Sequence, residues 1–138
     1  MLVHLFNEIM ELEEKAIITE EFKNISNNDM HIIEAIGLEK NNNMSRIARK
    51  LNITVGSLTT SMNSLVNKGY VVRENGKLDR RVVYISLTEL GEKAFRHHES
   101  FHDEMTEAVL QRLGPEDVPV LVKTLDTLKE FFEQYKEH

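Results

Sequence analysis

Apolar residues change their spacing between residues 44 and 88, and this change limits the folds available to the chain. Over residues 44–51 and 55–68 they recur at the intervals of an amphipathic helix. Thr54 and Gly69 are residue types that begin and end a helix, and they flank the second of these segments. Two helices joined by a short turn are therefore expected here.

The residues that follow have the composition of strands. Residues 70–73 and 82–87 are rich in β-branched and aromatic side chains, and Asn75-Gly76 lies between them as a turn signal. This pattern predicts a two-stranded hairpin with a charged tip. The order helix, short turn, helix, hairpin is what a winged helix-turn-helix requires.

Further helices are expected before this segment. Residues 2 to about 20 follow helical spacing, with apolar residues on one face. A second helix is expected to begin at Asn28, as its N-cap, with Asp29 in its first turn, and to stop near Gly37.

Two more helices are expected after the hairpin. Thr88 has the residue type of an N-cap and would begin a long helix over about 89–112, which Gly114-Pro115 ends. The last helix carries one apolar stripe, formed by Val118, Leu121, Leu125, Leu128, Phe132 and Tyr135.

The expected fold class is mainly α (α+β), with about six helices and a two-stranded wing in a single domain over residues 1–138. Residues 28–88 would form the winged helix-turn-helix lobe. The helices within about 1–20 and 89–138 have more apolar positions than one chain would bury alone. They are therefore predicted to join two copies into a homodimer with a large apolar interface.

The charge is distributed unevenly along the chain. The net charge is −6, yet residues 44–81 contain eight basic and only two acidic side chains. A basic region within an acidic chain is the electrostatic pattern of nucleic-acid binding. The eight basic residues are Arg46, Arg49, Lys50, Lys68, Arg73, Lys77, Arg80 and Arg81.

Several functional classes are disfavoured. The chain has no cysteine, so disulfides and thiolate metal sites are excluded. It lacks an apolar run of membrane-spanning length and a secretory signal, so no membrane partner is expected and the expected location is the cytoplasm. No glycine-rich phosphate loop, nucleophile elbow or H-E-x-x-H motif is present, and we expect neither an enzyme nor a cofactor.

Residues 54–67 have the properties of a helix that reads DNA. Their apolar face consists of Val55, Leu58, Met62, Leu65 and Val66, and the opposite face is rich in hydroxyl and amide groups without any acid. Such groups bond to base edges and phosphates in a major groove. Thr60 and Asn63 are expected to read bases and Lys68 to contact phosphate. The full set predicted here is Ser45, Thr54, Ser57, Thr59, Thr60, Asn63 and Lys68.

The hairpin tip supplies the second predicted DNA contact. Lys77, Asp79, Arg80 and Arg81 cluster there, and an arginine at a wing tip can enter the electronegative minor groove. Asp79 can hold a guanidinium by a bidentate pair, so it is expected to organise the tip. The spacing leaves open which arginine inserts and which has a structural role.

The stretch from Met44 to Gly91, MSRIARKLNITVGSLTTSMNSLVNKGYVVRENGKLDRRVVYISLTELG, resembles the MarR (multiple antibiotic resistance regulator) family. The matching pieces are I-A-x-x-L, L-x-x-K-G-Y, the D-R-R wing and L-T-x-x-G. The resemblance implies a triangular homodimer that binds a pseudo-palindromic, double-stranded operator. VGSLTTSMNSLVNKGY and DMHIIEAIG look most like the FabT-like branch. That branch represses type II fatty-acid synthesis with long-chain acyl-acyl carrier protein as corepressor.

Two effectors remain open at this point. An acyl chain would need an apolar pocket with a polar lining, predicted from Phe6, Ile9, His31, Ile32, Ile36, Phe95, His98, Phe101 and His102. A zinc-sensing branch of the same family has histidines at the positions of His31, His98 and His102, where Glu11, Glu14 or Glu99 could complete the ligands. A protein-binding role for residues 54–67 is a third possibility, which weak salt dependence would reveal.

Overall fold

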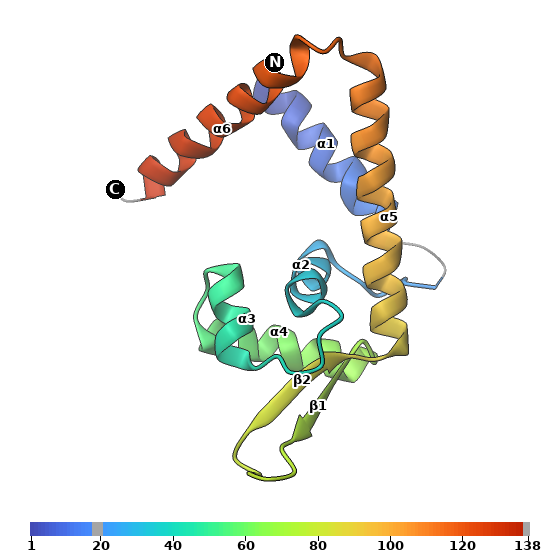
Figure 1. Ribbon diagram of the computed structural model, residues 1–138, viewed down its shortest axis with the longest axis vertical. Helices are drawn as coiled ribbons and strands as arrows, with labels where there is room; N and C mark the ends of the chain where they lie inside the picture. The colour runs from blue at the N-terminus through green and yellow to red at the C-terminus, as the bar shows by residue number, and fades with distance from the viewer. Residues whose placement is uncertain (18–20, 137–138) are drawn as a thin grey trace. The chain divides into compact units, whose positions relative to one another are not determined.

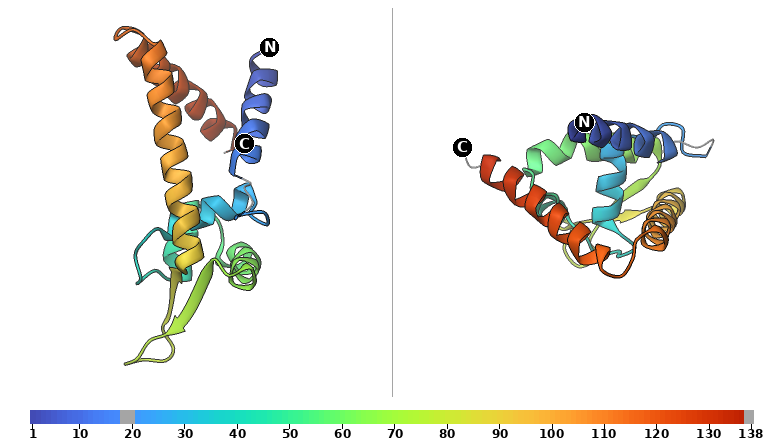
Figure 2. Two further views of the ribbon diagram at one scale, coloured as in Figure 1. Left: turned by 90° about the vertical axis from the view of Figure 1, so that its right-hand side faces the viewer. Right: turned by 90° about the horizontal axis from the view of Figure 1, so that it is seen from above.

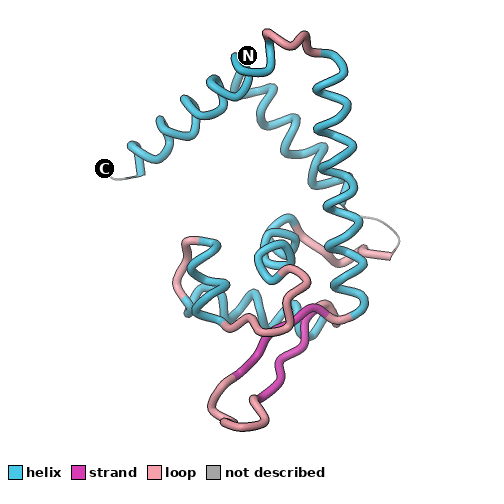
Figure 3. The backbone as a smooth tube through the Cα atoms, viewed as in Figure 1, coloured by secondary structure: helices cyan, strands magenta, loops and turns pink. Residues whose placement is uncertain are grey.

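The computed structural model describes residues 1–17 and 21–136, which fall into two compact units divided between Glu99 and Ser100. The described residues contain six helices and one two-stranded sheet (Figures 1 and 3), as predicted. The elements are α1 (Leu2–Ile17), α2 (Asn27–Ile36), α3 (Met44–Leu51), α4 (Val55–Lys68), β1 (Val71–Asn75), β2 (Val83–Leu87), α5 (Glu89–Arg112) and α6 (Asp117–Lys136). The part of the first predicted helix at residues 18–20 lies outside the described residues.

Helix α2 begins earlier than predicted, and its cap is Ser26 rather than Asn28. The Ser26 hydroxyl accepts a hydrogen bond from the Asp29 backbone N–H at 3.0 Å. The Asp29 carboxylate accepts one from the Ser26 N–H, also at 3.0 Å. This reciprocal capping box satisfies two N–H groups at once, which a lone Asn28 cap would not do. The helix ends at Gly37, as expected.

Local capping also sets the ends of the helix-turn-helix. The Asn43 side chain accepts from the Arg46 N–H to begin α3, and Asn52 ends it in the left-handed conformation at φ 56°. Asparagine tolerates this conformation better than most residues. Thr54 then caps α4 through the Ser57 N–H, and Gly69 ends it at φ 89°. The predicted boundaries of both helices are confirmed.

Strands β1 and β2 form an antiparallel ribbon in which Val71 pairs with Leu87 and Asn75 with Val83. In the left view of Figure 2 the ribbon extends away from helices α2, α3 and α4. The loop between the strands is longer than the predicted Asn75-Gly76 turn. The reason is that Asn75 is still paired and the Gly76 N–H bonds to the Val82 carbonyl at 2.8 Å.

Asn42 fastens the base of the hairpin to helix α2. Its backbone carbonyl accepts the Ile85 N–H at 2.7 Å, and its side-chain amide donates to the Ile36 carbonyl at 2.5 Å. The Asn42 side chain is fully buried. The Nδ2 bond offsets part of the cost of burying this amide, and together the two contacts connect β2 to the end of α2.

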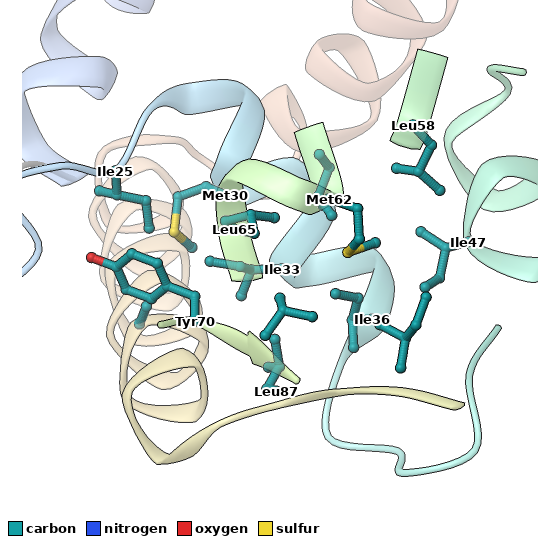
Figure 4. Packing of buried hydrophobic residues seen from close by; sticks show 14 of the residues in the cluster. Ile25, Met30, Ile33, Ile36, Ile47, Leu58, Met62, Leu65, Tyr70 and Leu87 are labelled. Carbon is teal, nitrogen blue, oxygen red and sulfur yellow. The ribbon is translucent and has the colours of Figure 1, made fainter. Parts of the chain in front are cut away.

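The core of the first unit lies between α2, α3, α4 and the hairpin (Figure 4). Helix α2 contributes Ile33 and Ile36, and α4 contributes Leu58, Met62 and Leu65, all fully buried. Each such side chain contributes about 1.5–3 kcal/mol through burial. Because α4 is held by these three residues along one side, its opposite side is turned to solvent.

The second unit contains the C-terminal part of α5 and all of α6. The two helices are separated at Gly114, whose N–H donates to the Asp117 carboxylate at 3.1 Å. This confirms the predicted break. Helix α6 exposes many large apolar side chains over half of their surface, namely Val120, Val122, Leu125, Phe131, Phe132 and Tyr135. None of the helices in the described ranges is long and apolar enough to cross a membrane.

Candidate nucleic-acid interface

Helix α4 presents a polar face to solvent. Its exposed polar side chains are Ser57, Thr59, Thr60, Asn63 and Asn67. The predicted apolar face is confirmed at Leu58, Met62 and Leu65, but Val55 is 43% exposed. Val55 was predicted on the same apolar face, but as the first residue of the helix it remains exposed.

Some hydroxyl groups on this face are already engaged within the helix. Thr59 Oγ1 donates to the Val55 carbonyl at 2.8 Å, and Thr54 Oγ1 donates to Ser57 Oγ at 2.9 Å. A hydroxyl has one proton, so these two threonines retain only acceptor capacity for an external ligand. Thr54 and Thr59 therefore suit donors on a base or bridging water, whereas neither is placed to donate to a phosphate.

Asn63 has a partner that sequence analysis did not assign. Its Oδ1 accepts a hydrogen bond from Arg73 Nη2 of β1 at 2.5 Å, and both residues are exposed. Arg73 was counted only as part of the basic region. Its position in the first predicted strand, a few residues beyond the helix that carries Asn63, could have indicated a contact between the two side chains.

Lys68 was predicted to contact a DNA phosphate, but its side chain pairs with a carboxylate of the protein. Its ammonium lies 2.8 Å from Asp29 Oδ2, and only 28% of the Lys68 side chain and 6% of the Asp29 side chain are exposed. The same carboxylate caps α2. Lys68 thus neutralises a buried carboxylate between α2 and α4, and we remove it from the candidate DNA contacts.

Replacing Lys68 with methionine should lower the free energy of unfolding by about 1.5–3 kcal/mol, the usual loss for a hydrogen bond to a charged group. The cause is that Asp29 would remain buried without its cation. Urea unfolding measures the change, with the exposed Lys23 replaced by methionine as the matched control. If Lys68 contacted phosphate instead, the slope of log affinity against log salt would fall by about 1.

A positively charged cleft lies between helix α3 and the wing. Its volume is about 530 Å³, and Arg46, Arg49 and Arg81 are among the residues that line it. Ser45, a predicted DNA contact, lies in the same cleft at the first turn of α3. The other lining residues are Asn43, Met44, Val82 and Val83. Three arginines that line one cleft form a region that suits phosphate oxygens.

The wing tip contains the carboxylate–guanidinium pair that the sequence predicted. Arg81 donates to Asp79 through Nε and Nη2, each at 3.1 Å, and its backbone N–H also donates to Asp79 at 3.0 Å. These bonds, the side-chain ones first, lower the pKa of Asp79, so its carboxylate stays ionised to a lower pH than that of an unpaired aspartate. The paired arginine is therefore Arg81.

Arg80 and Lys77 complete the charged tip. Both are exposed, and the Arg80 backbone carbonyl accepts a hydrogen bond from the Asn75 side chain at 2.8 Å. That bond holds the backbone of Arg80 in place. The described geometry therefore gives Arg81 the restrained position in the cleft and Arg80 a place on the exposed tip.

The residues predicted for an effector pocket do not share one environment. Phe6 and Ile9 are 46% and 52% exposed, whereas Ile32 and Ile36 are part of the lobe core. Phe95 packs against that core, and Phe101 and His102 are half-buried. In the described structure, Phe6 and Ile9 and the two core isoleucines therefore do not form one apolar wall.

The three candidate metal-binding histidines also differ. His31 is exposed, whereas His98 is buried. His98 Nε2 lies 2.6 Å from Glu34 Oε1, and a ring nitrogen of His98 lies within 4.8 Å of a Glu13 carboxylate oxygen. His102 follows one turn later on α5. Glu13 and Glu34 were missed, since the expected carboxylates were Glu11, Glu14 and Glu99.

Comparison with known proteins agrees with this geometry. Residues 25–91 match the family described as "Winged helix DNA-binding domain". The crystal structure of Streptococcus pneumoniae FabT in complex with DNA is 36% identical and has a TM-score of 0.84, over 97% of this chain and 94% of that one. The chain belongs to the MarR family. It is therefore a DNA-binding transcriptional regulator and not an enzyme.

This MarR-family regulator also has more distant relatives. The transcriptional regulator AdcR of Streptococcus pyogenes serotype M6 is 26% identical over 112 residues, which is 79% of this chain and 76% of that protein. An uncharacterized HTH-type regulator of Bacillus subtilis, YpoP, is 29% identical over 90 residues. That match spans 65% of this chain and 62% of YpoP, slightly less than two thirds of its length.

Proposed function

We propose that this MarR-family regulator is a homodimeric repressor of type II fatty-acid synthesis genes, with long-chain acyl-acyl carrier protein as corepressor. The observation that carries the DNA-binding part is the exposed polar face of α4 beside the arginine cleft. Similarity to FabT over nearly the whole chain supports the fatty-acid part. The regulator would act in the cytoplasm, where a bacterial chromosome is accessible.

The proposed DNA contacts follow from the geometry. Residues of about 28–88 form the DNA-binding lobe, α4 enters the major groove, and the arginine cleft receives a backbone phosphate. Asp79 orders Arg81, and Arg80 reaches the minor groove. The proposed contacts are Ser45, Thr54, Ser57, Thr59, Thr60, Asn63, Lys77, Arg80 and Arg81.

Exposed apolar surface supports the homodimer. Helix α1 exposes Val3, Leu5, Phe6, Ile9, Met10 and Leu12, each by at least 40% of its surface. Helix α6 exposes the apolar side chains described above. A chain in water rarely leaves so much apolar surface uncovered, so we propose that α1, α5 and α6 meet their counterparts in a second copy. Homodimers are typical of the MarR family.

Sensing of a metal ion is the second candidate function. It is favoured by the proximity of the Glu13 carboxylate to the buried His98 ring, with His102 on the next turn of α5. Carboxylate oxygens and imidazole nitrogens together suit Zn²⁺. In this reading Glu34 orients the His98 ring through their 2.6 Å contact, as carboxylates do beside metal-bound histidines.

An operator titration separates the two effectors. The DNA is a duplex containing the inverted repeat upstream of the fatty-acid-synthesis genes of the same genome. Fluorescence anisotropy is measured with no addition, with long-chain acyl-acyl carrier protein, with the same carrier protein lacking an acyl chain, and with excess chelator. We expect two chains per duplex and about 5–150-fold tighter binding with the acylated carrier alone, the usual range of allosteric coupling.

Each other outcome rejects one part of the proposal. Weaker binding in chelator would favour the metal-sensing function, since ligand removal would then control the DNA-binding state. No response to the acylated carrier would reject the fatty-acid assignment and leave DNA binding intact. Equal affinity for the operator and a random duplex would reject sequence-specific repression.

A further inference from the structure

We infer that Arg73 fixes the amide orientation of Asn63 and weakens its oxygen as an acceptor, so that Asn63 reads DNA mainly as a hydrogen-bond donor. Arg73 Nη2 lies 2.5 Å from the oxygen of the Asn63 amide. A guanidinium group has donors and no acceptor, so the amide atom that faces it has to be the oxygen. The orientation of the Asn63 side chain is therefore imposed by chemistry.

The hairpin determines the position of the Arg73 guanidinium. Arg73 is the third residue of β1 and is paired in register with Ile85 of β2. Ile85 is fully buried, and its N–H is bonded to the Asn42 carbonyl. The strand pair and the core thus hold the backbone of Arg73 in place. The guanidinium group reaches Asn63 from this fixed backbone position.

This arrangement changes which bases Asn63 can recognise. An unrestrained asparagine pairs with adenine in the major groove by accepting from N6 and donating to N7. In this protein Arg73 takes one of the two lone pairs of the oxygen, and its positive charge there opposes the approach of a second donor such as adenine N6–H. The Nδ2 hydrogens meet no such competition. They match guanine O6 and N7 or thymine O4, whereas cytosine presents only a donor in that groove. Asn63 should therefore select guanine or thymine over adenine and cytosine.

The inference rests on the proposed function, because it requires that the exposed face of α4 enters a major groove. Within that function it gives Arg73 a specific part as a positioning residue. A different role for Arg73, direct contact with a phosphate, makes an opposite prediction. It would add to the salt dependence of binding and affect every DNA sequence alike.

In vitro selection from a random duplex library tests the assignment. The proteins are the wild type, Asn63→Ala, Arg73→Met, Arg73→Lys and the double variant Asn63→Ala/Arg73→Met. The base position read by Asn63 is the one whose preference disappears in Asn63→Ala. We expect guanine or thymine there for the wild type and for Arg73→Lys, since lysine is also a pure donor.

Arg73→Met should move the preference at that position toward adenine by roughly 5–100-fold, the range of one bidentate base contact, and leave other positions unchanged. In the double variant the preference should be absent. Adenine selected by the wild type would overturn the inference, as would an unchanged preference in Arg73→Met. A salt slope lowered by about 1 in Arg73→Met would assign Arg73 to phosphate instead.

A failure of the proposed function has a different signature. In that case the wild type enriches no sequence at all, and the inference is rejected with it. If the wild type enriches an inverted repeat, sequence-specific binding stands and only the role of Arg73 is decided by the variants. Because Arg73 and Asn63 are both exposed, the variants should fold, and their thermal unfolding midpoints should match that of the wild type.

Discussion

Replacing Gly91 with alanine should lower the free energy of unfolding by about 3 kcal/mol or more, the upper part of the range for overpacked sites. A Cβ at this position would lie 2.1 Å from the Tyr70 carbonyl oxygen and 3.1 Å from Leu87 Cβ. The Tyr70 carbonyl cannot retreat easily, because it accepts the Thr88 N–H at 3.0 Å. The substitution would therefore separate the start of α5 from the hairpin.

Urea unfolding followed by circular dichroism measures this effect. Gly56→Ala is the matched control, because a Cβ on Gly56 would meet nothing closer than 3.9 Å. Alanine in a helix is favoured over glycine by roughly 0.5–1 kcal/mol, so the control should be slightly stabilised. A decrease of less than about 1 kcal/mol in Gly91→Ala would mean that the junction relaxes, contrary to our account.

Removing the three arginines of the cleft together should produce the largest decrease in DNA binding. For Arg46→Gln, Arg49→Gln and Arg81→Gln combined, we expect the slope of log affinity against log salt to fall by about 2.7, because each phosphate that is no longer neutralised lowers it by about 0.9. The decrease in affinity should be similar on operator and random DNA, because phosphates carry no sequence information. Anisotropy titrations over a series of salt concentrations provide both quantities.

A control variant removes the same charge elsewhere. Lys93→Gln, Arg96→Gln and Lys129→Gln combined changes the net charge by the same amount at exposed positions outside the cleft. Its slope should stay close to that of the wild type, since screening limits the reach of exposed charges to about 8–10 Å. If the two triple variants behaved alike, net charge rather than the cleft would govern binding.

The local features of this regulator were accessible from its sequence. Helix α4 begins after Thr54 and ends at Gly69, as predicted. Both ends were predictable because capping depends on a residue and its neighbours within one turn. The same holds for the Asp79–Arg81 pair, whose members are two residues apart. The cap of α2 was predicted at Asn28 and lies at Ser26. The reciprocal bonds of Ser26 and Asp29 decided the cap.

Helical spacing identified apolar faces but not what covers them. Ile32 and Ile36 lie in the lobe core, while Phe6 and Ile9 are exposed, although all four fit an amphipathic helix equally well. The same pattern is produced by packing against the core, a second subunit or a ligand. The predicted effector pocket depended on this distinction, which periodicity does not contain.

The sequence by itself determined the order of helices and strands, the two ends of α4, the polar face of that helix and the basic region that marks the DNA-binding lobe. Only the tertiary structure decided that Lys68 neutralises Asp29, 39 residues away, and that Arg73 turns the amide of Asn63. The physical reason is distance along the chain. Periodicity and capping act within a few residues, whereas these contacts exist only after separate elements pack around a shared core.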